Sequence, residues 1–220
     1  FGDTFEPEPE FIPGKTRIKY SAHVLGLRER LNLLDVLLSG WMTAGKWTEQ
    51  FEAKMKAFFG SRDFVFVNSG SAANLLMVSS LMANTIRTDL RDYDLPPLKP
   101  GDEVITPAVT FPTTLAPIVQ CGLVPVFVDV DLGTYNVPPW RIREAIGPLT
   151  KAVFLPHTLG FPFEAEEIRD VCENNPLWMI EDGCDALGAT FNGKLVGTFG
   201  AMSSLSFYPA HHTTCGEGGG

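Results

Sequence analysis

Apolar residues follow two periods along the chain, a helical one and a shorter one that is typical of strands. The helical period predicts helices over residues 24–38, 47–59, 72–83, 113–121, 139–146 and 164–174. Short apolar runs predict strands at 64–67, 103–106, 124–128, 152–155 and 177–181. After the first two helices, strands and helices alternate. This order is typical of an α/β fold with a mainly parallel sheet flanked by helices.

The same pattern indicates where the elements and the domain begin. Thr48 is the expected N-cap of the second helix, because its hydroxyl can accept a hydrogen bond from a first-turn N–H group. Residues 87–101 are polar and rich in proline, so we expect a surface loop inside the domain. We therefore divide the chain into an N-terminal helical segment, residues 1–40, and one large domain, residues 41–220.

Composition excludes several classes of partner. The net charge of −9 argues against nucleic acid, whose binding needs a basic surface. No apolar run approaches the roughly 20 residues needed to cross a bilayer, so we expect no membrane association and a cytoplasmic protein. The four cysteines are widely spaced, which favours neither disulfides nor a complete metal site. Because the chain starts at Phe1 and stops in a run of glycines, we expect it to be a fragment of a longer protein.

Polar residues at the ends of the predicted strands are the candidates for chemistry, because ligands of open α/β sheets collect there. The turn Asn68-Ser69-Gly70-Ser71 precedes a helix and suits a phosphate, although an ordinary N-cap has the same pattern. Asp182 ends a strand and suits a protonated pyridine nitrogen, although acids are common in such loops. Phe111 suits stacking on a flat cofactor ring, although an aromatic residue beside a strand end is often core.

Two adjacent histidines, His211 and His212, lie in a loop bounded by proline and glycine at residues 206–219. Residues of this kind can be metal ligands, general bases or exposed loop positions. A mononuclear metal site fits poorly, since neither the HxxxH nor the HxH spacing is present. A zinc site made by both histidines and Cys215 stays open as a third reading.

Taken together, six segments of the chain resemble the DegT/DnrJ/EryC1/StrS family of nucleotide-sugar aminotransferases and dehydratases. The matching segments are residues 44–52, 67–74, 101–114, 125–131, 180–189 and 206–219. The resemblance implies the large domain of a fold-type I enzyme that uses pyridoxal or pyridoxamine phosphate, without the smaller C-terminal domain, and a homodimer. It also assigns cofactor-binding roles: the phosphate would be held by Gly70, Ser71 and Ser206, the ring would be covered by Phe111, and the pyridine nitrogen would pair with Asp182.

His211 stands where the aminotransferases of this family carry the lysine that bonds to the cofactor. Imidazole has no primary amine and cannot form that bond, but it suits a general base near neutral pH. The resemblance therefore narrows to 3-dehydratases that hold pyridoxamine phosphate noncovalently and act on a nucleotide-linked 4-keto-6-deoxyhexose, a step toward the 3,6-dideoxyhexoses of lipopolysaccharide O-antigen. Asp185, where aminotransferases usually carry glutamine, supports the same branch and is counted among the cofactor-binding residues.

Within that branch the resemblance favours a CDP-linked sugar, and it then implies a [2Fe-2S] cluster with Cys184 as one ligand. A flavin and iron–sulfur reductase that takes electrons from NADH would be the partner of such an enzyme. Three alternatives remain: a cluster-free GDP-4-keto-6-deoxymannose 3-dehydratase, a sugar aminotransferase, and a noncatalytic pseudoenzyme that only binds nucleotide sugar or cofactor.

Overall fold

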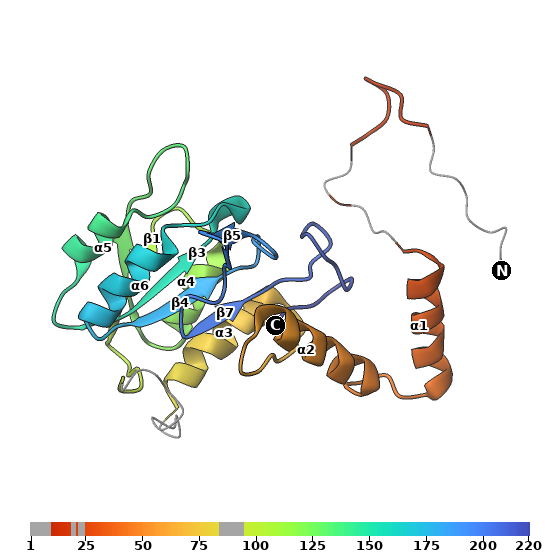
Figure 1. Cartoon of the computed structure of the whole chain (residues 1–220), viewed down its shortest axis with the longest axis horizontal. Helices are drawn as coiled ribbons and strands as arrows, with labels where there is room; N and C mark the ends of the chain where they lie inside the picture. The colour runs from red at the N-terminus through yellow and green to blue at the C-terminus, as the bar shows by residue number, and fades with distance from the viewer. Residues whose placement is uncertain (1–9, 19–20, 22–24, 84–94) are drawn as a thin grey trace.

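The computed structural model describes residues 10–18, 21, 25–83 and 95–220. Its main sheet consists of parallel strands in the order β2-β1-β3-β4-β7. The strands are β1 (Glu103–Pro107), β2 (Val124–Val128), β3 (Thr150–Pro156), β4 (Trp178–Asp182) and β7 (Met202–Ser204). The predicted α/β fold with a mainly parallel sheet flanked by helices is thereby confirmed, and Figure 1 shows this layered body.

Helices pack on both faces of this sheet and bury two apolar clusters. On one face are α3 (Gly70–Leu81) and α4 (Pro112–Gln120), and on the other are α5 (Pro139–Ala145) and α6 (Ala165–Asn174). Because side chains alternate along a strand, Ile180 of β4 joins the α3/α4 cluster while its neighbour Met179 joins the α5/α6 cluster. Asp182, two residues after Ile180, therefore points toward α3 and α4.

The N-terminal helices are α1 (Leu27–Ser39) and α2 (Lys46–Phe59), close to their predicted bounds. The prediction of Thr48 as the N-cap of α2 is wrong. The helix begins one turn earlier, with Gly45 in the N-cap position and no side-chain cap, so Thr48 lies inside the first turn. The N–H of Glu49 donates to the Gly45 carbonyl at 3.0 Å, and this hydrogen bond closes the first turn around the threonine.

The predicted strand at 64–67 is also wrong, although the segment runs beside Gly219. Its contact with other backbone is an isolated bridge between Val67 and Gly219. The N–H of Phe66 donates to the Glu52 carboxylate of α2 at 2.8 Å, and Phe64 and Phe66 both pack against Phe51 of that helix. Tertiary contacts with α2 thus replace a strand ladder here.

Short elements complete the described chain. The pair β5 (Thr190–Phe191) and β6 (Lys194–Leu195) is an antiparallel hairpin, and η2 (Thr158–Gly160) is a short turn of 3₁₀ helix. Of the predicted loop at 87–101, residues 95–101 form a loop, and residues 87–94 lie outside the described residues. Within the described ranges, the helices are all too short or too polar to span a bilayer.

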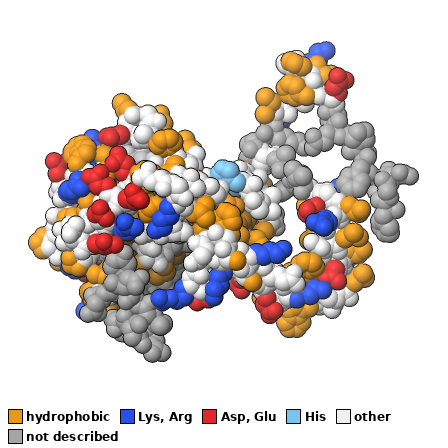
Figure 2. All heavy atoms as spheres, in the orientation of Figure 1, with side chains coloured by type: hydrophobic (Ala, Val, Ile, Leu, Met, Phe, Trp, Pro, Cys, Tyr) orange, Lys and Arg blue, Asp and Glu red, His pale blue; other side chains and the backbone are white. Residues whose placement is uncertain are grey.

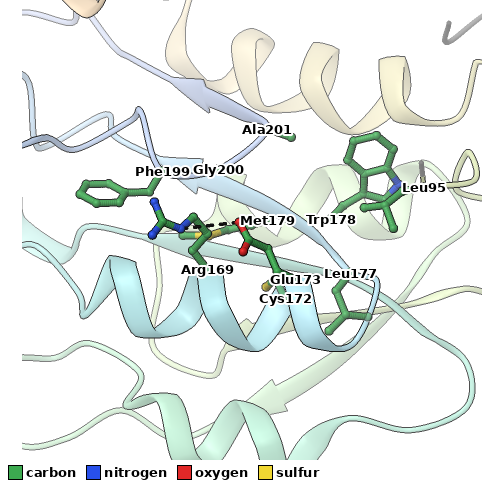
Figure 3. A pocket seen from close by; sticks show the side chains of 10 residues that line it. All are labelled: Leu95, Arg169, Cys172, Glu173, Leu177, Trp178, Met179, Phe199, Gly200 and Ala201. Atoms are coloured by element: carbon green, nitrogen blue, oxygen red, sulfur yellow. Dashed lines mark ion pairs between the residues drawn. The ribbon is translucent and has the colours of Figure 1, made fainter. Parts of the chain in front are cut away.

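Two hollows were compared as possible ligand sites. A crevice between β4 and α6 holds about 10 Å³ and contains the ion pair of Arg169 with Glu173, drawn in Figure 3; that is roughly the room one water needs. A groove of about 660 Å³ runs between residues 59–67, α3 and β7. Neither hollow is lined by Asp182 or His211, so neither coincides with the site predicted from the sequence.

Candidate active site

Asp182 is the centre of a buried polar cluster at the carboxyl end of β4, with 5% of its surface exposed. One carboxylate oxygen, Oδ2, accepts hydrogen bonds from the Asn74 amide and the Thr114 hydroxyl, both at 2.8 Å. The other, Oδ1, accepts from the backbone N–H of Cys184 at 3.2 Å and the hydroxyl of Ser204 at 3.3 Å. Four donors around one carboxylate suit its ionised form, which only accepts hydrogen bonds.

Sequence reasoning found Asp182 but missed the residues that hold it. Asn74 and Thr114 come from the first turns of α3 and α4, and Ser204 ends β7; all three side chains are fully buried. Asn74 gave a usable signal, because it is a polar residue inside the apolar run of a helix. Its carbonyl oxygen Oδ1 is buried and has no hydrogen-bond partner among the described residues.

The N-terminus of α3 meets the segment after β7, as the phosphate prediction requires. Ser69 caps the helix, its hydroxyl accepting from the N–H of Ala72 at 3.1 Å. Gly70 packs so closely that an added Cβ would lie 2.7 Å from Cβ of Ser206 and 2.8 Å from Sγ of Cys184. Ser71 is exposed beside it. The structure therefore brings Gly70, Ser71 and Ser206 together at a helix start, where backbone N–H groups and the helix dipole favour an anion.

Phe111 lies at the N-cap of α4, three residues before Thr114. Its side chain is 70% exposed, so the core reading of this residue is wrong. Its carbonyl accepts from the N–H of Thr114 at 3.0 Å, which ties the exposed ring to the helix turn that holds Asp182. A large ring left in solvent beside a buried acid is suited to stacking on a flat ligand.

His211 lies beside Asp185. These are the two residues that set the sequence apart from aminotransferases. Nε2 of His211 lies 3.2 Å from Oδ1 of Asp185, and the histidine side chain is 22% exposed. Nδ1 is buried and unpaired within the part of the chain that the structure describes. His212 makes a separate contact, its ring lying beside Gly160 of η2.

Cys184 is partly buried in this structure. Burial, with the charge of Asp182 as a smaller cause, raises the pKa of its thiol far above the usual range. Its sulfur packs against Gly70 and lies 3.7 Å from the Ser204 hydroxyl. The described residues contain no group of three metal-ligating side chains, which leaves the zinc reading with His211, His212 and Cys215 without support.

The polar residues gathered around Asp182 fit pyridoxal or pyridoxamine phosphate. The site offers an anion site at the start of α3, a buried carboxylate, an exposed aromatic ring and a histidine whose Nδ1 is unpaired. The orphaned Asn74 Oδ1 and His211 Nδ1 are polar atoms of the kind a bound ligand satisfies.

Comparison with known proteins identifies the same relatives. The chain is 49% identical over 214 residues to dTDP-4-dehydro-2,6-dideoxy-D-glucose 3-dehydratase of Saccharopolyspora spinosa, and the match covers 97% of this chain and 45% of that protein. It is 43% identical over 217 residues to the lipopolysaccharide biosynthesis protein RfbH of Salmonella typhimurium strain LT2, and this match covers 99% of the chain and 48% of RfbH. The chain spans about half the length of the curated relatives it matches.

Among solved structures, GDP-4-keto-6-deoxy-D-mannose-3-dehydratase of Escherichia coli with bound hydrated pyridoxal phosphate superposes with a TM-score of 0.83 at 37% identity, over 91% of this chain and 49% of that one. The sequence profile of the DegT/DnrJ/EryC1/StrS aminotransferase family matches residues 25–220. The chain belongs to the DegT/DnrJ/EryC1/StrS aminotransferase family.

Proposed function

We propose that the chain carries the cofactor site of a nucleotide-sugar 3-dehydratase, which removes the C3 hydroxyl of a nucleotide-linked 4-keto-6-deoxyhexose with noncovalently held pyridoxamine phosphate. The observation that carries the proposal is His211, which stands in place of the family lysine and lies 3.2 Å from Asp185, in a site that also contains the buried Asp182. A noncatalytic binder is less well supported, because it would have no use for a positioned base beside that carboxylate.

The cofactor, when bound, supplies a primary amine and an electron-accepting ring. The start of α3 with Ser206 would hold its phosphate, and Phe111 would lie over its ring. Asp182, which Asn74 and Thr114 hold in place, would pair with the ring nitrogen. His211 would take up a proton as general base, with Asp185 beside its Nε2. Because imidazole cannot form an imine with the cofactor, binding would rest on noncovalent contacts of this kind.

The nucleotide and the source of electrons are the finer parts of the proposal. Two relatives are named as 3-dehydratases of a dTDP-linked and a GDP-linked sugar, so the CDP-linked substrate expected from the sequence stays a prediction. An iron–sulfur cluster and a reductase partner also stay predictions.

Proton exchange tests the proposed activity directly. The protein is loaded with pyridoxamine phosphate and incubated in D₂O with CDP-, dTDP- or GDP-linked 4-keto-6-deoxyhexose, and deuterium at the cofactor C4′ carbon is measured by mass spectrometry. We expect incorporation with at least one of the three sugars and a fall of about 10²–10⁴-fold in His211→Asn, the usual contribution of a general base. A protein that binds cofactor and sugar but shows no incorporation is the noncatalytic binder.

A further inference from the structure

A second buried carboxylate lies directly behind the first. Glu181 precedes Asp182 on β4, so its side chain points to the opposite face of the sheet, toward α5 and α6. It is fully buried. Its Oε1 accepts from the backbone N–H groups of Phe199 at 2.8 Å and Gly200 at 2.6 Å.

His157 completes the set of donors to this carboxylate. Its Nε2 lies 3.0 Å from Oε2 of Glu181, which also accepts from the N–H of Gly197 at 2.7 Å. The N–H of Phe163 points to Nδ1 at 3.4 Å, so Nε2 carries the donated proton, and the imidazole stacks on the Phe163 ring with centroids 4.0 Å apart. The backbone N–H of His157 donates to the carbonyl of Asp182 at 3.0 Å.

The backbone groups held by Glu181 belong to the turn 197–200, which leads directly into β7. This strand pairs with β4 over three residues, and Ser204 at its end donates to Asp182. The ladder is short, so the turn before it also contributes to the position of Ser204, beside the hydrogen bond from the N–H of Gly183 to the Ser204 carbonyl at 3.0 Å. We infer that Glu181 and His157 form a positioning pair, which aligns Asp182 and β7 from the far face of the sheet; this inference rests on the proposed function.

The chemistry of the pair argues for alignment over plain stability. Burying a carboxylate is costly, and an apolar side chain of similar volume is often as stable or more so. Glu181 instead collects three backbone N–H groups and an imidazole, which fixes the direction of the turn as packing alone would not. Sequence reasoning assigned no role to Glu181 or to His157.

Two substitutions at one position separate alignment from stability. His157→Leu removes the donor to Glu181, whereas His157→Gln keeps an amide N–H that can reach it. Ile168→Ala, in α6 on the same face of the sheet, is a control that creates a cavity without removing a hydrogen-bond donor to Glu181. The readouts are the dissociation constant for pyridoxamine phosphate, the thermal midpoint, and amide hydrogen exchange of residues 202–206 without cofactor.

We expect His157→Leu to weaken cofactor binding about 10-fold, the effect of losing one hydrogen bond to a charged group, and to speed exchange in residues 202–206. His157→Gln should recover most of both properties. Ile168→Ala should lower the thermal midpoint and leave the dissociation constant unchanged. The inference is overturned if His157→Leu binds as tightly as wild type, or if Ile168→Ala weakens binding equally. Failure of the wild-type protein to bind the cofactor would instead overturn the proposed function, and this inference with it.

Discussion

The carboxylate of Asp182 receives donors from four separate segments, and this makes its charge the property to test at the scale of single residues. In Asp182→Asn, an amide nitrogen replaces one carboxylate oxygen. This nitrogen is itself a donor, and it would face the donors whose hydrogen bonds the oxygen accepts. An unsatisfied buried donor costs about 1–3 kcal/mol. We expect a comparable loss in the free energy of unfolding, together with at least a 10-fold weaker affinity for pyridoxamine phosphate. Chemical denaturation and cofactor titration measure the two effects. Asp129→Asn, at an exposed site, is the matched control and should change neither.

Gly70 tests the anion site at the same scale. A methyl group there would lie 2.7 Å from Cβ of Ser206, closer than real side chains approach, so the start of α3 and the segment after β7 would have to move apart. We expect Gly70→Ala to cost about 1–3 kcal/mol of stability and to weaken phosphate binding. Gly147→Ala is the control, because an added Cβ there meets its neighbours at 3.6 Å or more. Equal effects of the two substitutions, measured by unfolding and by phosphate titration, would contradict the anion site.

Helix α1 raises a different question at the scale of elements, because none of its residues is buried. Leu27, Leu31, Leu34 and Leu38 follow one another at helical spacing and are all exposed, and Figure 2 shows hydrophobic side chains along this helix, which stands apart from the body. An exposed apolar stripe of this kind marks an interface. We predict that a second copy covers this stripe, in the homodimer that the resemblance implies.

Replacing two leucines of the stripe tests that assignment. We expect the double variant Leu31→Ser, Leu38→Ser to be a monomer, because burying a leucine side chain in an interface stabilises the dimer by roughly 1.5–3 kcal/mol. Light scattering after size-exclusion chromatography gives the mass. Asn32→Ser, off the stripe, should leave the dimer intact. A wild-type monomer, or a double variant with unchanged mass, would show that the leucine stripe of α1 is not a dimer interface.

How far the sequence predicts the structure also depends on the element. The helices and the strands β1 to β4 follow from periodicity, because local patterning and burial agree there. The run 64–67 has the same apolar character but is not a strand, since Glu52 takes the N–H of Phe66. β7 was not predicted, as its three residues are placed by the turn that Glu181 holds. Asp182 was found from its strand end, whereas Thr114 and Ser204 were missed because their partners are distant in sequence.

For the whole molecule, buried thiols link stability to pH. Burial raises the pKa of Cys172 to about 12, with a smaller contribution from Glu173. The pKa of a cysteine in an unfolded chain is about 8.5. The folded state therefore keeps its proton where the unfolded state loses it. The stabilising contribution of this group is complete below the unfolded pKa and declines as pH rises toward the folded value, by about 1.4 kcal/mol per pH unit.

Cys172→Ala isolates this contribution from the other groups that titrate in alkali. We expect the variant to be less stable than wild type near pH 7, because the packed sulfur is lost from the α5/α6 cluster. Between about pH 9 and 11 the wild-type free energy of unfolding should fall more steeply, so that the two curves converge or cross. Denaturant unfolding at a series of pH values gives both slopes. Parallel curves would mean that Cys172 ionises alike in the folded and unfolded protein, against its burial in the structure.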